Sequence, residues 1–401
     1  MFENIIGQPG VVEELTRDIR DGRLPASMLF HGPDMSAKLT TALELARVLM
    51  CGRNTGEWGC DCPACRQNRL LENPYLLLLG WRNFEDEIRA VADVLRRCDG
   101  RAVRFLFVRG VRKLIKRFDG VLWEGAENKA ANAFEMIREI EELMEPLLPD
   151  ALDEKVEKKE SILDKVIELS AGLIKKAGMD GIPVHQIRKA SYWAHTTSGG
   201  NRKVVILENA DRMLPGAANA LLKTLEEPPP GTYFMLLSSK KERIMPTLRS
   251  RLRQFQFNRR NDEVQAEILR RVFRDTSGKF KTLESFFLTW GIDTELVSSA
   301  RESFLKAISE RTPDIFFADD RPYAKELADG RFFKALLDAV GDSLQERYRR
   351  SGVGDFADRD SMRKYELWVS SLRKQQRRME SYNMNPMLLL HSLYKEVAID
   401  S

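Results

Sequence analysis

Residues 203–257 read KVVILENADRMLPGAANALLKTLEEPPPGTYFMLLSSKKERIMPTLRSRLRQFQF, and this stretch decides the fold. The apolar run 204–207 predicts a buried strand. Pro215 opens a predicted helix, because its missing N–H costs nothing in the first turn. The triple proline 228–230 ends that helix, and the apolar run 234–237 predicts a second buried strand. Strands that alternate with helices predict an α/β domain with a parallel sheet.

A second informative stretch, HGPDMSAKLT at residues 31–40, is similar to a phosphate-binding loop, whose pattern is G-x-x-x-x-G-K-[ST]. Gly32 and Lys38 match this pattern. Ala37 replaces the second glycine and resists the positive φ that wraps amides around phosphates. Leu39 replaces the hydroxyl that ligates Mg²⁺. We expect the strand–loop–helix shape to remain without its phosphate chemistry, and an ordinary turn with a chance lysine is the alternative.

The second element of an ATPase site would follow the strand at 204–207. Such a site holds an Asp for the metal and usually a Glu that activates water. This chain has Glu208 and Asn209 there. Glu208 keeps a carboxylate, but Asn209 cannot accept a proton and is no general base. We therefore expect no productive binding of ATP and no ATPase activity of this chain on its own.

Residues 217–228, AANALLKTLEEP, resemble a signature of bacterial clamp-loader subunits of the AAA+ class. The tripeptide Ser250-Arg251-Leu252 is similar to their Ser-Arg-Cys motif, with leucine in place of cysteine. The resemblance implies an AAA+ P-loop-type parallel sheet, a helical lid and an all-α C-terminal collar. The altered phosphate loop is similar to that of delta-prime subunits of the DNA polymerase III clamp loader, whereas the gamma/tau motor subunits keep an intact loop.

The resemblance gives Arg251 a role, because the arginine of this motif reaches into the ATP site of the neighbouring subunit in that family. It implies a non-hydrolysing subunit that assists ATP-driven loading of the sliding clamp onto primed DNA. The implied partners are the gamma/tau and delta subunits, the sliding clamp and, through the complex, primed DNA, with no membrane involved. The alternatives are a surface role for Arg251, an active motor of the same family, or a DNA-binding replication accessory protein.

The cysteines form the other constellation: Cys51, Cys60, Cys62 and Cys65 lie close together, and Cys98 stands apart. No signal peptide or long apolar span is evident, so we expect a reducing, cytoplasmic setting, which favours metal over disulfides. Four thiolates suit tetrahedral zinc, and the family carries a structural zinc module at this place. The compressed Cys60-Asp-Cys62 spacing leaves a loop of free thiols as the alternative.

The expected organisation is an AAA+ core at 1–257, a small helical lid at 258–311 and a collar at 312–401. The core contains the zinc module at about 50–66 and a helical insertion at about 82–178 that the resemblance does not cover. The first half of the insertion is basic and its second half acidic, which predicts a helical hairpin whose halves attract each other. A contact for DNA or a partner protein is the alternative. The net charge of +4 neither demands nor forbids nucleic-acid contact.

Overall fold

The chain folds into two compact units, Met1–Phe287 and Leu288–Ser401. The division falls inside the segment expected to form a lid, so the three-part organisation stays a prediction. Residues 152–155 and 178 of the expected insertion lie outside the described residues. The computed structural model describes residues 1–151, 156–177, 181–278, 280, 282–350, 359–382 and 384–399.

The first unit is built on a five-stranded parallel sheet in the order β2-β3-β4-β1-β5. This confirms the α/β class that the sequence predicts. Strands β1 to β4 each contain an uninterrupted apolar run, which is typical of parallel strands covered on both faces. The strands are β1 (Ser27–His31), β2 (Leu76–Leu79), β3 (Lys203–Leu207), β4 (Thr232–Ser238) and β5 (Arg253–Gln256).

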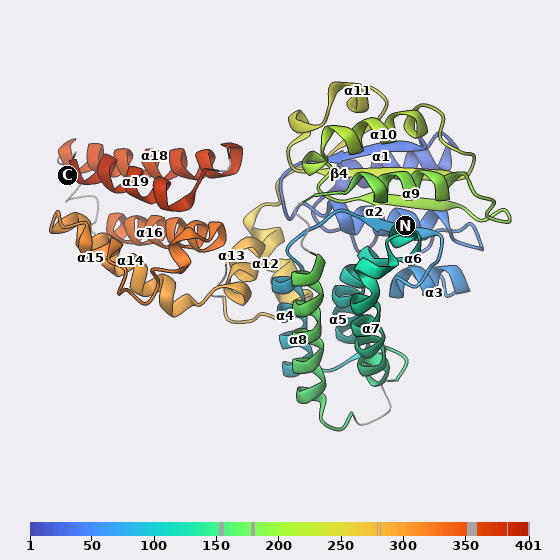
Figure 1. The fold of residues 1–401 in the computed structure, drawn as a ribbon, viewed down its shortest axis with the longest axis horizontal. Helices are drawn as coiled ribbons and strands as arrows, with labels where there is room; N and C mark the ends of the chain where they lie inside the picture. The colour runs from blue at the N-terminus through green and yellow to red at the C-terminus, as the bar shows by residue number, and fades with distance from the viewer. Residues whose placement is uncertain are drawn as a thin grey trace. The chain divides into compact units, whose positions relative to one another are not determined.

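Helices cover this sheet and position its carboxyl edge. An apolar core packs α1 and α2 against the strands, and Leu15, Leu45, Phe30 and Val204 are all buried in it. Figure 1 shows α9 and α10 side by side in front of β4. The helices of this layer arrangement are α1 (Pro9–Arg20), α2 (Lys38–Leu49), α3 (Pro63–Leu70), α9 (Val184–His195), α10 (Pro215–Glu226) and α11 (Pro246–Arg249), with short 3-10 turns η3 (Ala210–Arg212) and η4 (Lys241–Arg243).

A helical segment separates β2 from β3, and its helices α4, α5, α7 and α8 run side by side in Figure 1. The predicted electrostatic attraction is present, because Arg112 of the basic half pairs with Glu141 of the acidic half at 2.8 Å. Arg101 pairs with Asp150 at 2.9 Å. The elements are α4 (Phe84–Arg97), α5 (Arg101–Ile115), η1 (Lys116–Phe118), α6 (Gly120–Trp123), α7 (Glu127–Met144), η2 (Glu145–Leu147) and α8 (Lys159–Ala177).

The second unit is helical and has an apolar core of its own, in which Phe304, Phe316 and Leu336 are buried. Within the part of the chain that the structure describes, no helix is long and apolar enough to cross a membrane. Helix α12 (Asp262–Arg271) precedes the boundary and α13 (Leu283–Gly291) spans it. The remaining helices are α14 (Thr294–Ser309), α15 (Asp314–Phe317), η5 (Glu326–Ala328), α16 (Gly330–Arg350), α18 (Arg359–Tyr382) and α19 (Pro386–Ile399).

Candidate functional site

The loop between β1 and α2 retains the expected strand–loop–helix shape. Gly32 has a φ of +147°, and a Cβ there would lie 2.1 Å from the carbonyl oxygen of Phe257, so the close approach requires glycine. Ala37, which stands before the first residue of α2, has a φ of +74°. The sequence indicates that alanine resists this conformation, yet the fold imposes it. The left-handed region brings Cβ too near the next carbonyl oxygen, so Ala37 is strained.

Replacing Ala37 by glycine is expected to stabilise the chain by about 0.5–1 kcal/mol, because glycine adopts positive φ without strain and its own entropic cost is smaller. The free energy of unfolding in urea measures the change. Ala42→Gly, in the interior of the same helix, is the matched control and is expected to destabilise by about 1 kcal/mol. Destabilisation by both substitutions would contradict a strained Ala37.

Lys38 turns its ammonium group onto the loop itself. Its Nζ donates to the carbonyl oxygens of Gly32 at 2.6 Å and Pro33 at 2.5 Å, and to Ser36 Oγ at 3.4 Å. Burial lowers the pKa of Lys38. The next residue, Leu39, is buried in the apolar core and offers no oxygen to a metal. The loop's lysine is thus satisfied by the chain's own oxygen atoms.

Glu208 follows β3 at the carboxyl edge of the sheet, where ligands of open α/β sheets bind. Its Oε1 accepts a hydrogen bond from Arg82 Nη1 at 3.2 Å, and its Oε2 accepts one from Arg117 Nη2 at 2.6 Å. Arg117 is 2% exposed, and burial lowers its pKa to about 10, which leaves it charged at neutral pH. Both carboxylate oxygens are therefore paired with guanidinium groups.

Asn209 occupies the position of the expected general base without acting as one. It has a φ of +52°, a left-handed conformation that asparagine tolerates. Its Nδ2 donates to the carbonyl oxygen of Trp81 at 2.7 Å, which ties the ends of β2 and β3 together. The amide has a structural contact in the place where an ATPase holds a proton acceptor.

Sequence patterns alone do not reveal that Arg82 and Arg117 pair with Glu208. The sequence contains one signal for such a pairing. Glu208 directly follows the apolar run 204–207, and a carboxylate buried there needs a partner of opposite charge. The sequence does not reveal the partner, because Arg82 and Arg117 stand 126 and 91 residues from Glu208. The structure places the loop and Glu208 at the same carboxyl edge of the sheet, directly after β1 and β3.

Arg251 lies just beyond α11 on the first unit, and its side chain is 33% exposed. Its Nε donates to Glu226 Oε1 at 2.7 Å, and its Nη1 donates to the carbonyl oxygen of Thr247 at 2.6 Å. Its Nη2 contacts the same oxygen of Glu226. Among the described residues, these hydrogen bonds go to α10 and α11 and not to Glu208 or to the loop at 31–40 that is similar to a phosphate-binding loop. The guanidinium is accordingly held at the surface by an acidic residue that is itself exposed.

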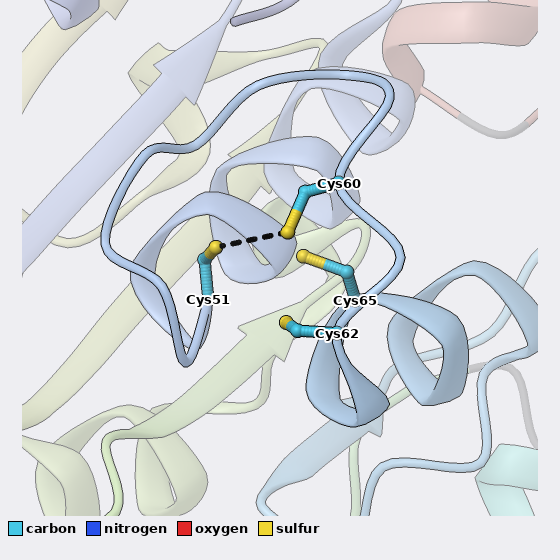
Figure 2. A group of neighbouring side chains, drawn as sticks. All are labelled: Cys51, Cys60, Cys62 and Cys65. Atoms are coloured by element: carbon cyan, nitrogen blue, oxygen red, sulfur yellow. Dashed lines mark hydrogen bonds between the residues drawn. The ribbon is translucent and has the colours of Figure 1, made fainter.

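The four clustered cysteines converge on one point (Figure 2). All four are buried, and their sulfur atoms lie within 4.8 Å of one another, with Cys51 and Cys60 at 3.7 Å. Four sulfurs bound to tetrahedral zinc at about 2.3 Å are about 3.8 Å apart. Cys62 immediately precedes α3 and Cys65 lies in its first turn, so the start of this helix brings both thiols to the cluster. Cys60 reaches the same cluster despite the compressed Cys60-Asp-Cys62 spacing. The cluster can hold a metal ion such as zinc.

The surroundings of the cluster resemble the outer shell of a metal site. Arg47 Nη1 donates to Cys65 Sγ at 3.2 Å, and Arg47 pairs with the buried Glu44 at 2.7 Å. Burial opposes ionisation of Cys51, but backbone hydrogen bonds from Gly56 and Arg53 outweigh it and lower its pKa to about 6. Burial raises the pKa of Cys65, so a bound cation would be needed to hold all four as thiolates.

A family model described as "DNA polymerase III, delta subunit" matches residues 7–96 and 124–261, which is more than half of the chain. The chain belongs to this family. Several of the relatives that match are named DNA polymerase III subunit delta′, which confirms the expected resemblance to delta-prime subunits. Residues 97–123, which include α5, η1 and α6, lie outside the family match.

The delta′ subunit of Haemophilus influenzae is 40% identical over 91 residues, 22% of this chain and 28% of that protein. The one from Pseudomonas aeruginosa is 46% identical over 71 residues, 18% of this chain and 22% of that protein. Each alignment spans less than a third of the relative. A crystal structure of a DNA polymerase III gamma subunit-related protein from Thermotoga maritima is similar over 54% of this chain and 80% of that chain, at 19% identity and a TM-score of 0.27.

Proposed function

We propose that this member of the delta-prime family is a non-hydrolysing clamp-loader subunit that assists ATP-driven loading of the sliding clamp onto primed DNA. Its partners are the gamma/tau and delta subunits, the sliding clamp and, through the assembled complex, primed DNA. It works in the cytoplasm. Its own remnant of a nucleotide site takes no part in hydrolysis.

One contrast carries the proposal. The remnant site is closed by the chain's own side chains, since Lys38 binds its loop and Glu208 is paired with two arginines. Arg251, in contrast, is displayed at the surface. A guanidinium is always charged, and its planar fork matches phosphate oxygens. A subunit without hydrolysis of its own can therefore contribute Arg251 to an ATP site of its neighbour.

We also propose a structural zinc ion held by the four clustered cysteines. The sulfur separation of 3.7 Å between Cys51 and Cys60 supports it, as does the contact from Arg47 to Cys65. Zinc bound there would join the end of α2 to the start of α3. The four thiolates would fill all the ligand positions of tetrahedral zinc and leave none open for a substrate, so the role is structural and not catalytic.

The domain roles extend the same proposal. The helices from 258 to 311 form the lid and those from 312 to 401 form the collar, which joins the subunits of the complex. Within the helical segment between β2 and β3, residues 97–123 lie outside the family match and are an addition to the AAA+ core of 1–257. A collar role is supported by the helical character of the second unit.

A DNA-binding accessory role is disfavoured by the ionic contacts of the basic segment. Apart from the exposed Arg101, its arginines and lysines are turned inward rather than presented together to solvent. The contacts pair Arg104 with Asp99, Arg109 with the carbonyl oxygen of Arg69, Arg112 with Glu72 and Glu141, Lys113 with Glu87, and Arg117 with Glu208.

Calorimetric titration of the purified chain with Mg-ATP tests the proposal. No binding at millimolar nucleotide is expected, because Leu39 cannot ligate Mg²⁺ and Glu208 is already paired. An intact gamma/tau subunit serves as the positive control. Micromolar binding, or ATP turnover by the chain alone, would instead favour a motor subunit.

A further inference from the structure

The pairing of Glu208 with two arginines belongs to a larger ionic cluster of five side chains. Arg82 Nη2 lies 2.7 Å from Glu87 Oε2, and Lys113 Nζ donates to Glu87 Oε1 at 2.5 Å. All five side chains are 23% exposed or less. Three cations face two carboxylates, so Glu208 sits in a site that is already positively charged. The remaining members, Arg117 and Glu208, are those described above.

Arg117 is placed by rigid neighbours. Its carbonyl oxygen accepts a hydrogen bond from Trp123 Nε1 at 2.9 Å, and Phe118 stacks on Trp123 with ring centroids 5.6 Å apart. The guanidinium lies over the ring of Phe84 at 5.4 Å. Its Nε and Nη1 have no hydrogen-bond partner among the described residues, so Glu208 is the acceptor on which this buried cation depends.

We propose that Arg82 and Arg117 supply, within the chain, the two positive charges that a divalent metal ion would supply to Glu208, and that they thereby exclude the metal. Both carboxylate oxygens are engaged, so a metal must displace the guanidinium groups to reach them. Displacement would leave Arg117 buried without a counter-charge, which is strongly unfavourable. Arg117 lies in the segment outside the family match, whereas Arg82 and Glu208 lie within it.

The inference rests on the proposed loss of hydrolysis and names residues responsible for it. It explains why a carboxylate remains at position 208 although no hydrolysis is expected there. The carboxylate anchors η1 and the start of α4 to the end of β3 through charge. A neutral residue at this position would leave two arginines without their shared acceptor.

The inference is tested by measuring how tightly Mn²⁺ binds to the full-length, zinc-loaded chain. Electron paramagnetic resonance reports the concentration of the free ion. The double variant Arg82→Gln/Arg117→Met removes both charges while keeping side-chain volume. It is expected to bind one Mn²⁺ at least about tenfold more tightly than the unaltered chain, because a buried carboxylate without a counter-ion attracts a cation. Adding Glu208→Gln to this variant should abolish the gain.

A folded double variant, verified by circular dichroism, that binds Mn²⁺ no better than the unaltered chain would overturn the inference. If the double variant does not fold, Arg82→Ala decides, because this more exposed side chain tolerates truncation and its loss frees Oε1 of Glu208. Arg89→Ala, which breaks the surface pair with Glu85, is the matched control and should change nothing. ATP turnover by the unaltered chain would overturn the proposed function. The Mn²⁺ measurement would still decide whether Arg82 and Arg117 exclude a metal ion from Glu208.

Discussion

Replacing Arg251 by alanine is expected to lower ATP turnover at the one site that Arg251 serves by about 10³-fold or more, and so to slow the assembled clamp loader, since an arginine supplied in trans to a transferring phosphoryl group contributes about 10³ to 10⁵ in rate. The fold should be unaffected, because Arg251 is partly exposed and its surface pair with Glu226 contributes little to stability. The measurement is the steady-state ATPase rate of the complex, reconstituted with clamp and primed DNA, with either form of this chain.

Two further variants make the result specific. Arg253→Ala removes a nearby surface arginine that pairs with Glu14 and should leave the rate unchanged. Arg251→Lys keeps the charge but loses the planar fork, so an intermediate rate is expected. If a complex that contains stoichiometric Arg251→Ala subunit turns over ATP at the full rate, Arg251 is not an arginine finger.

Loss of the proposed zinc ion from the cysteine cluster is expected to unfold the segment at 50–66, because a structural zinc site contributes on the order of 10 kcal/mol to local folding. Cys65→Ser should act like chelation, since it removes a ligand and the sulfur that accepts from Arg47. Elemental analysis should find about one zinc per chain in the unaltered protein. Limited proteolysis within 50–66 and the thermal melting temperature then report the loss.

Cys98→Ser provides the control, because this thiol lies outside the cluster and donates to the carbonyl oxygen of Val94 at 3.3 Å. It should leave both zinc content and melting temperature unchanged within error. Protein purified under reducing conditions that contains no zinc, and that melts at the same temperature with and without chelator, would show that the four thiols are free.

The apolar runs predicted the centre of the fold without help from the tertiary structure. Residues 204–207 and 234–237 became β3 and β4, and Pro215 became the first residue of α10. Strands buried on both faces must be apolar throughout, and proline is restricted to the first turn of a helix, so these local patterns have one outcome. The altered phosphate loop was also evident, since Leu39 lacks a hydroxyl in any conformation.

Other features depended on the tertiary structure. The edge strand β5 has a single buried residue, Phe255, and its mixed composition carries no strand period; it forms because β1 offers it a free edge. The convergence of Cys60 and Cys62 depends on the turn into α3, which spacing alone left open.

By itself, the sequence determined the parallel sheet, because a short apolar period predicts each buried strand. It also determined that the remnant site lacks the hydroxyl for Mg²⁺ and the general base, and that four thiols are candidate metal ligands, because these follow from the chemistry of single side chains. Only the tertiary structure decided that Arg82 and Arg117 pair with Glu208. Charge pairs between residues far apart in the chain have no sequence period, because the packing of helices, and not local spacing, sets which charges meet.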